Sequence, residues 1–385
     1  MKEKFLRELA DIQTGPFGSQ LHKEDYVADG TPIVTVEHLG NKMFSEQNLP
    51  RVSNTDKNRL KKYVLKQGDI VFSRVGSVDG CSYVDQKHDG WMFSGRCLRV
   101  RPTSEIDSEY LYYYFCLEET KQFVRNIAVG ATMPSINTKL LGEVVVTFPE
   151  LEQQKRISGI LSAIDSKIEV NQKINDNLSD LLQTIYQGQF GKVGLANNCG
   201  ILADICSYSK DKIEISKLSL DTYYSTENML PEKSGAVKAT SLPTTSQTTA
   251  CHKGDTLISN IRPYFKKIVY CEDDCGCSTD VLCFKPVHPR YTAYLFSTLY
   301  ADSFFNFMVA GAKGTKMPRG DKQQIMTYPV VLPSEKDLSE FNSVATPILT
   351  QIYSNRTESE RLSAIRDTLL PKLILGEIDV PSIQL

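Results

Sequence analysis

The stretch FPELEQQKRISGILSAID, residues 148–165, joins an apolar run ending in proline to a segment with apolar residues at helical spacing. A second stretch of this kind, LPSEKDLSEFNSVATPIL, occupies residues 332–349 and begins 184 positions later. Both place a strand-like run and a proline directly before a helix. Self-similarity at a fixed offset is typical of a repeated structural unit. The sequence therefore predicts a duplicated architecture.

Other landmarks recur in the same order. FSGRCLRVRP (93–102) aligns at this offset with CSTDVLCFKP (277–286), and the Met-Pro of GATMPSIN with the Met-Pro of GTKMPRGD. Strand-like runs at 33–36, 69–75, 81–84, 93–100 and 143–148, with one main helix near 108–126, indicate an α+β domain. We predict two similar globular recognition domains separated by long helices: domain one at 1–150, a central helix at 151–190, domain two at 191–334, and a C-terminal helix and tail at 335–385.

The two long helices each carry a seam of positions spaced alternately by four and three residues, as in a coiled coil. The seam positions include Ile157, Leu161, Ile164, Ile168, Asn171, Asn175, Leu178 and Leu182 in the first helix, and Phe341, Ala345, Ile348, Ile352, Asn355, Ser359 and Leu362 in the second. A seam of about 30 residues spans about 45 Å, more than the width of one such domain. Packing of each helix on its own domain alone is therefore disfavoured, and we expect an antiparallel coiled coil within the chain. Pro347 should kink the second helix or mark a late start.

Composition restricts the class of protein. The chain has 385 residues, a formal net charge of −2 and ten cysteines. No apolar run is long enough to span a bilayer and the first residues form no apolar signal core, so we expect a cytoplasmic protein with reduced thiols. Cys271, Cys275, Cys277 and Cys283 lack the paired spacing of a zinc site, which favours ordinary thiols over a metal site without deciding the matter.

Two unlike domains at the ends of paired helices could read two separate stretches of one DNA duplex. Because the halves differ in their side chains, the target should be asymmetric, whereas identical readers favour a palindrome. Local basic stretches at 57–66 and 261–267 fit a DNA-facing surface despite the near-neutral total charge.

Particular stretches resemble the specificity subunit of type I restriction–modification systems. They are QTGPFGSQL (13–21), GDIVFSRVGS (68–77), GATMPSINTKLLGEVVVTFPELEQQKRI (130–157), STENMLP (225–231) and IRDTLLPKLILGEI (365–378). The resemblance covers essentially the whole chain, although the second junction lacks the glutamine-rich form of the first. It implies two target-recognition domains, with helices that set the half-site spacing and dock two methyltransferase (modification) subunits. It also implies that S-adenosylmethionine, ATP and Mg act only in the methyltransferase and restriction subunits, and that this chain needs no cofactor.

The chain lacks motifs for chemistry of its own. It contains no Pro-Pro pair for the base clamp of an adenine methyltransferase and no phosphate-binding loop of the GxxxxGK[ST] type. The five histidines are scattered, and no metal or catalytic site is expected. We therefore expect a non-catalytic subunit. A stand-alone coiled-coil DNA-binding or scaffold protein, and the recognition part of a fused restriction–methylation enzyme, are the alternatives.

Candidate DNA contacts are polar and basic side chains on glycine-rich loops, where the backbone can approach DNA closely. They are Ser19, Gln20, Arg74, Ser77, Thr132, Ser135, Asn137 and Lys139 in the first half, and Thr226, Asn228, Arg262, Tyr264, Lys266, Lys267, Lys313, Thr315, Lys316 and Arg319 in the second. Each could instead be a solvated or turn-capping residue.

Overall fold

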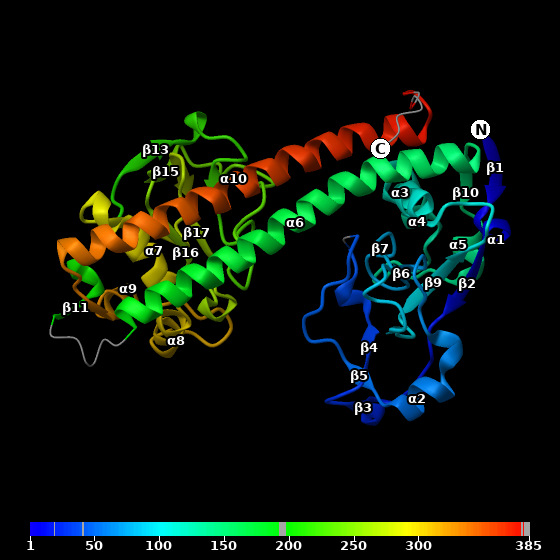
Figure 1. The fold of residues 1–385 in the computed structure, drawn as a ribbon, viewed down its shortest axis with the longest axis horizontal. Helices are drawn as coiled ribbons and strands as arrows, with labels where there is room; N and C mark the ends of the chain where they lie inside the picture. Colours follow the sequence, from blue (N-terminus) through cyan, green and yellow to red (C-terminus); the bar gives the residue numbers. More distant parts are fainter. Residues whose placement is uncertain (19, 41, 192–197, 379, 381–385) are drawn as a thin grey trace. The chain divides into compact units, whose positions relative to one another are not determined.

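The computed structural model describes residues 1–18, 20–40, 42–191, 198–378 and 380. The chain forms two compact units: unit 1 comprises Met1–Glu169 with Ser359–Leu385, and unit 2 comprises Val170–Glu358. Each unit is mixed α and β (Figure 1). None of the helices in the described part of the chain combines the length and apolar character that a membrane span requires.

Unit 1 contains two small sheets and a two-stranded ribbon. Its elements are β1 (Lys2–Phe5), α1 (Leu6–Leu9), β2 (Ala10–Thr14), β3 (Tyr26–Val27), β4 (Thr31–Val34), β5 (Arg51–Val52), α2 (Asn54–Arg59), β6 (Ile70–Ser73), β7 (Cys81–Tyr83), β8 (Met92–Phe93), β9 (Cys97–Pro102), α3 (Ser108–Cys116), α4 (Glu118–Ile127), α5 (Thr138–Gly142) and β10 (Val145–Phe148). The sheets have the strand orders β2-β9-β6-β7 and β3-β5-β4-β8, and β1 pairs with β10. The strand IVFS of β6 is buried at every position, as expected for a central strand covered on both faces.

Unit 2 repeats most of this arrangement. Its elements are β11 (Cys199–Ile201), β12 (Cys206–Tyr208), β13 (Lys212–Glu214), β14 (Tyr223–Tyr224), β15 (Gln247–Cys251), β16 (Thr256–Ser259), β17 (Ile268–Tyr270), β18 (Cys275–Cys277), β19 (Val281–Pro286), α7 (Thr292–Tyr300), α8 (Asp302–Ala310), α9 (Lys322–Ile325) and β20 (Pro329–Val331). The strand orders are β12-β19-β16-β17 and β13-β15-β18-β14, and β11 pairs with β20. The first sheets of the two units have corresponding strand orders and the terminal ribbons pair alike, which confirms the predicted duplication. The second sheets differ, because β4 lies between β5 and β8 whereas β14 lies at the edge beside β18.

Individual hydrogen bonds are duplicated as well. The hydroxyl of Tyr110 donates to the carbonyl of Thr147 at 3.1 Å, and that of Tyr294 donates to the carbonyl of Val331. Both tyrosines are fully buried in the cores of their units. Each ties the first core helix, α3 or α7, to the strand that precedes a long helix. The strand that precedes each long helix is therefore held to the core in the same way in both units.

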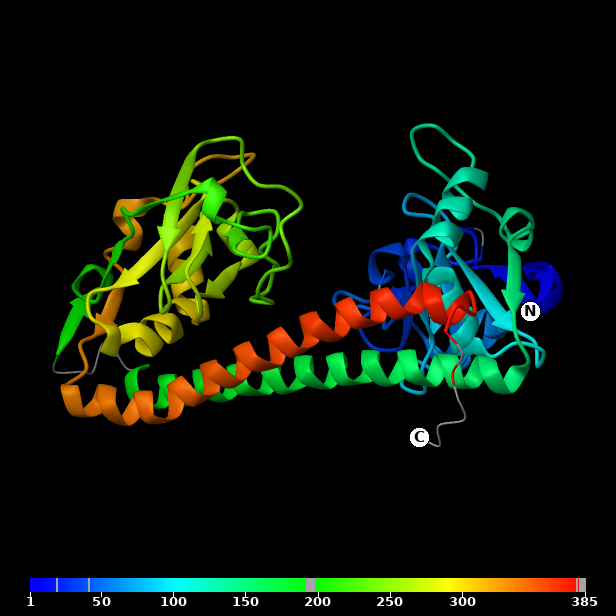
Figure 2. The same ribbon diagram turned by 90° about the horizontal axis from the view of Figure 1, so that it is seen from above.

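The long helices are α6 (Leu151–Phe190) and α10 (Glu335–Ile374), each of 40 residues. In unit 1, Ile157 and Leu161 of α6 share a core with Leu370 and Ile374 of α10. In unit 2, Leu182 of α6 shares a core with residues of α10, where Phe341, Ala345 and Ile348 are buried. Within unit 2, Asn171 and Asn175 of α6 bond to Glu358 and Ile352 of α10, so residue numbers rise along one helix as they fall along the other, and the two helices are antiparallel there (Figure 2).

A polar layer interrupts the apolar seam within unit 2. The side-chain amide of Asn355 donates to Oδ1 of Asn175 at 2.9 Å, and that of Asn175 donates to the carbonyl of Ile352 at 3.2 Å. Nδ2 of Asn171 donates to Oε2 of Glu358 at 2.8 Å. Buried amides that satisfy one another favour a single register of a helix pair over its alternatives. The remaining seam positions, Ile164, Ile168, Leu178, Ile352, Ser359 and Leu362, are half-buried.

Two sequence-based expectations need correction. The single helix expected near 108–126 is two helices, because Leu117 adopts an extended backbone (φ −59°, ψ 134°) that places its side chain in the core. The late start expected at Pro347 is wrong, since α10 begins at Glu335 and continues through this proline. Pro347 is exposed, so the carbonyl that loses its helical hydrogen bond there can be solvated.

Candidate nucleic-acid interface

Two predicted groups of DNA contacts meet in unit 1. The loop between β6 and β7 and the loop between α4 and α5 form an isolated bridge between Val75 and Ser135. The amide of Gly76 donates to the carbonyl of Pro134, and the amide of Ile136 donates to the carbonyl of Arg74, both at 2.9 Å. We call residues 74–80 and 129–137 the first loop pair. Arg74 and Ser77 are thereby held beside Thr132 and Ser135.

Unit 2 builds the same scaffold from different residues. Ile261 forms the bridge with Arg319, the amide of Arg262 donates to the carbonyl of Pro318 at 2.8 Å, and the amide of Gly320 donates to the carbonyl of Asn260 at 3.2 Å. We call residues 260–267 and 313–320 the second loop pair. By these bonds, Arg74 corresponds to Asn260, and Gly76 corresponds to Arg262.

Each loop pair presents one tight turn closed by backbone hydrogen bonds. Ser135 and Val129 exchange amide–carbonyl bonds at 2.8 and 2.9 Å, and Arg319 and Lys313 exchange two at 2.9 Å. Gly130 lies within the first turn at φ +112°, and a Cβ there would stand 2.7 Å from the carbonyl oxygen of Met133. Only glycine fits this position. The turn is therefore a fixed projection rather than a loose loop.

The tips of these turns expose apolar side chains that a search for polar and basic contacts passes over. Met133 is 66% exposed and Met317 is 48% exposed. Their equivalence was visible in the sequence, where the two Met-Pro pairs align at the offset of the repeat, but neither methionine was chosen as a contact.

Most cations of the second loop pair are engaged within unit 2. Nζ of Lys313 lies 2.6 Å from Asp321, a guanidinium nitrogen of Arg319 lies 3.1 Å from Asp280, and Nζ of Lys266 lies 3.0 Å from Asp302. Hydrogen bonds from lysines lower the pKa of Asp321 and of Asp302 below the usual carboxyl value. Lys267 donates to the carbonyl of Thr226 at 2.6 Å, and its burial lowers its pKa.

The basic loop at 313–319 is therefore less positive than its sequence indicates, because Asp321, two residues beyond it, and the distant Asp280 pair with its cations. Thr315 and Lys316 are exposed, and no ion pair involving Lys316 occurs within the described ranges. Tyr264 is also exposed, and its ring lies 4.8 Å from that of Phe265.

In the first loop pair, Nη1 of Arg74 donates to the carbonyl of Gly95 at 3.1 Å, and its guanidinium lies 5.2 Å from the ring centre of Phe17. Ser77 and Thr132 are exposed, as is Lys139 on α5. Oγ of Ser135 donates to the carbonyl of Val129 at 3.3 Å. These side chains lie on or beside one local surface.

Several predicted contacts have structural roles that compete with DNA binding. Oδ1 of Asn137 accepts the amide of Leu140 and caps α5, as Asp321 caps α9. Oε1 of Gln20 accepts a hydrogen bond from the Tyr63 hydroxyl at 2.6 Å. Thr226 contributes the backbone carbonyl bound by Lys267. Ser19 lies outside the described residues.

Asn228 has an internal structural role that the sequence did not predict. It is 6% exposed, and its amide nitrogen donates at 2.9 Å to the carbonyls of both Tyr223 and Val237. Its Oδ1 accepts the amide of Ser225 at 2.6 Å. Asn228 therefore holds the loop that follows β14 together. The polar composition of STENM reflects these internal hydrogen bonds.

We expect Asn228→Ala to destabilise unit 2 by about 2 kcal/mol, because it leaves buried backbone groups without partners. Urea unfolding of the variant measures this loss. Thr226→Ala is the matched control and should change the free energy of unfolding by less than about 0.5 kcal/mol, because only the backbone of Thr226 is engaged. Equal stability of Asn228→Ala and the wild type would contradict a stabilising role for the Asn228 hydrogen bonds.

The cysteine group is a buried cluster in unit 2. The sulfurs of Cys271 and Cys275 lie 3.6 Å apart, and the thiol of Cys283 lies 3.3 Å from Oδ2 of Asp255. Burial raises the pKa of Asp255. No cluster of three or more His, Cys, Asp or Glu side chains with the geometry of a metal site was found in the part of the chain that the structure describes. The cysteines pack with Met229 and Val281 as small apolar residues.

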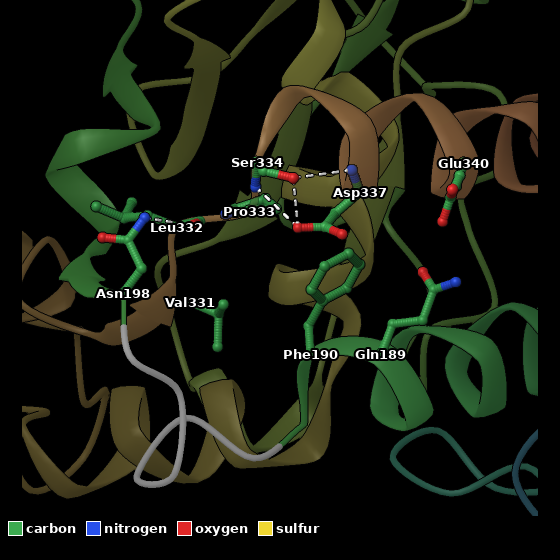
Figure 3. A pocket seen from close by; sticks show the side chains of 9 residues that line it. All are labelled: Gln189, Phe190, Asn198, Val331, Leu332, Pro333, Ser334, Asp337 and Glu340. Atoms are coloured by element: carbon green, nitrogen blue, oxygen red, sulfur yellow. Dashed lines mark hydrogen bonds between the residues drawn. The ribbon is translucent and has the colours of Figure 1, made fainter.

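A cavity of about 390 Å³ lies in unit 2 where α10 begins (Figure 3). Ser334 and Asp337 point toward each other there, and Oγ of Ser334 donates to Oδ2 of Asp337 at 2.7 Å. The amide of Asp337 donates back to Oγ of Ser334 at 3.2 Å. These groups cap the start of α10, which is a structural role.

Comparison with known proteins gives a consistent result. Residues 1–180 match the family described as type I restriction modification DNA specificity domain. The type I restriction enzyme MjaIX specificity subunit of Methanocaldococcus jannaschii is 22% identical over 98% of this chain and 93% of its own length. The HindI specificity subunit of Haemophilus influenzae is 28% identical over 34% of this chain and 29% of its own.

The fold is also shared with a solved structure. The S subunit of a type I restriction–modification system from M. genitalium matches with a TM-score of 0.58 at 17% identity, over 100% of this chain and 96% of that one. Residues 1–180 therefore match a type I restriction modification DNA specificity domain, and the whole chain shares its fold with the S subunit of such a system.

Proposed function

We propose that the first and second loop pairs each read one half of an asymmetric, two-part DNA target. The observation that carries this proposal is the reuse of one backbone scaffold with different side chains. Both pairs share the same bridges and the same proline carbonyl acceptors. One presents Arg74 and Ser77, whereas the other presents Arg262 and Tyr264. Equal scaffolds with unequal side chains should prefer unequal base sequences.

The paired helices have a distinct part in this proposal. Their lengths would fix the number of unread base pairs between the half-sites, and the polar layer of Asn171, Asn175 and Asn355 would keep the helix register single. A fixed register is needed because a slipped helix would change the separation of the two readers. Two methyltransferase subunits, and restriction subunits where they are present, would assemble with this chain.

The chemistry would belong to those partners. The methyltransferase subunits would bind S-adenosylmethionine and methylate adenine, and the restriction subunits would use ATP and Mg. This chain would supply target selection and would need no cofactor. Because its target is cellular DNA, we place the complex in the cytoplasm.

Reconstitution tests the proposal. The chain is expressed alone and together with a type I methyltransferase subunit from the same genome, and each preparation is incubated with labelled S-adenosylmethionine and DNA. We expect co-purification of the two subunits and label transfer only when both are present. Label transfer by the chain alone would favour a fused enzyme, and failure to associate with the methyltransferase would favour a stand-alone scaffold.

A further inference from the structure

Arg262 has a backbone conformation that its side chain disfavours. It has φ 50° and ψ 62°, in the left-handed region, where a Cβ crowds the following peptide group. Its equivalent in unit 1 is Gly76, with φ 76° and the same hydrogen bond from its amide to a proline carbonyl. Unit 1 thus uses the residue that the turn favours, and unit 2 does not. A strained residue at a binding loop indicates that its side chain has a use there.

The Arg262 side chain is also uncommitted. Its Nε is buried and makes no hydrogen bond within the described residues, where the guanidinium has no ion-pair partner either. Nearby cations differ in this respect, because Lys266 is paired with Asp302 and Arg319 with Asp280. No internal acceptor within the described residues therefore competes with a bound molecule for the terminal N–H groups of this guanidinium.

The surrounding structure holds Arg262 in place. Pro263 follows it and starts a short 3-10 turn, Pro263–Phe265, and the amide of Phe265 donates to the carbonyl of Arg262 at 2.9 Å. The amides of Glu232 and Lys233 donate to the carbonyls of Phe265 and Lys266 at 2.8 and 3.0 Å. The backbone from which the side chain extends is therefore fixed before any ligand binds. Such pre-organisation reduces the entropy lost when a contact forms.

We propose that Arg262 is a specificity-determining residue that donates two N–H groups to O6 and N7 of one guanine in the second half-site. This inference rests on the proposed function. A planar guanidinium matches the two acceptors that guanine presents in the major groove, and a lysine does not. Unit 1 has Gly76 at this position and so makes no equivalent contact.

Two variants separate this role from a structural one. Arg262→Gly installs the residue of unit 1, which the turn accepts, so its melting temperature should be at least that of the wild type. Arg262→Lys keeps the positive charge but loses the planar guanidinium, which can donate two parallel hydrogen bonds. Each variant is assembled with the methyltransferase subunits, and methylation rates are measured on duplexes in which every base pair of both half-sites is changed in turn.

For the wild-type complex, we expect a change at one G·C pair of the second half-site to lower the rate by about 5- to 150-fold. Both variants should lose this discrimination at that pair and keep discrimination at every other position, including the whole first half-site. An unchanged profile, or a uniform loss at all positions as for a phosphate contact, would overturn the role of Arg262 while leaving the proposed function standing. A wild-type complex without any sequence preference would overturn both.

Discussion

Replacing Phe341 with alanine should lower the free energy of unfolding of unit 2 by about 3–5 kcal/mol, the usual loss for a large aromatic core residue. Phe341 is fully buried, and its ring lies 5.4 Å from that of Phe190 and 6.3 Å from that of Tyr186. It also lies 6.5 Å from the ring of Tyr294. It therefore joins α10 both to the end of α6 and to the helix α7 of the same unit.

Hydrogen exchange measured under increasing urea, with peptides from β16 and β19, reports the loss in unit 2 separately from unit 1. Val344→Ala is the matched control, because Val344 lies on the same helix but is 44% exposed. It should change stability by less than about 0.5 kcal/mol. A Phe341→Ala variant that loses no more stability than this control would show that α10 is not part of the core of unit 2.

Lengthening both helices by one heptad should change the DNA target without changing either half-site. Seven residues are inserted after Glu169 in α6 and seven after Glu358 in α10, which are the positions where the two units divide. Seven residues add about 10 Å to a helix. At about 3.4 Å per base pair, the unread gap should grow by about three base pairs. Methylation sites of the variant, assembled with its methyltransferase subunits, are mapped by sequencing.

Two outcomes bear on the role of the helices in this variant. An unchanged gap would contradict the idea that helix length sets the spacing. Insertion into α6 alone is the control, because it shifts Ile157 and Leu161 of α6 relative to Leu370 of α10 in unit 1 without lengthening α10. That control should methylate poorly at either spacing.

The sequence predicted the architecture because the duplication supplied two independent copies of each signal. The alternation of four and three residues identified the seam, and the matching positions of Asn171 and Asn355 in the two halves marked its polar middle. The helix near 108–126 was less well predicted. The break at Leu117 comes from packing, since a buried leucine in an extended conformation leaves no trace in apolar periodicity.

The sequence located the loops that carry the candidate contacts, but it was less successful in choosing the individual side chains. Composition selected Asn228 for its polarity, but burial and the carbonyls of Tyr223 and Val237 give it an internal role. The positive charge of residues 313–319 was overestimated, because Asp280 reaches Arg319 from a distant part of the chain. Conversely, the sequence placed Arg262 among the candidate contacts but could not single it out. Its backbone conformation and its structural equivalence to Gly76 emerge only in the fold.

The central claim is that two unlike readers on one chain select a two-part target. Sequencing the methylated adenines in DNA modified by the wild-type chain with its methyltransferase subunits tests it most directly. The account predicts one recurring motif made of two different short specific runs, separated by a gap of constant length and unrestricted sequence. A single uninterrupted motif, or two half-sites that are inverted repeats of each other, would contradict it.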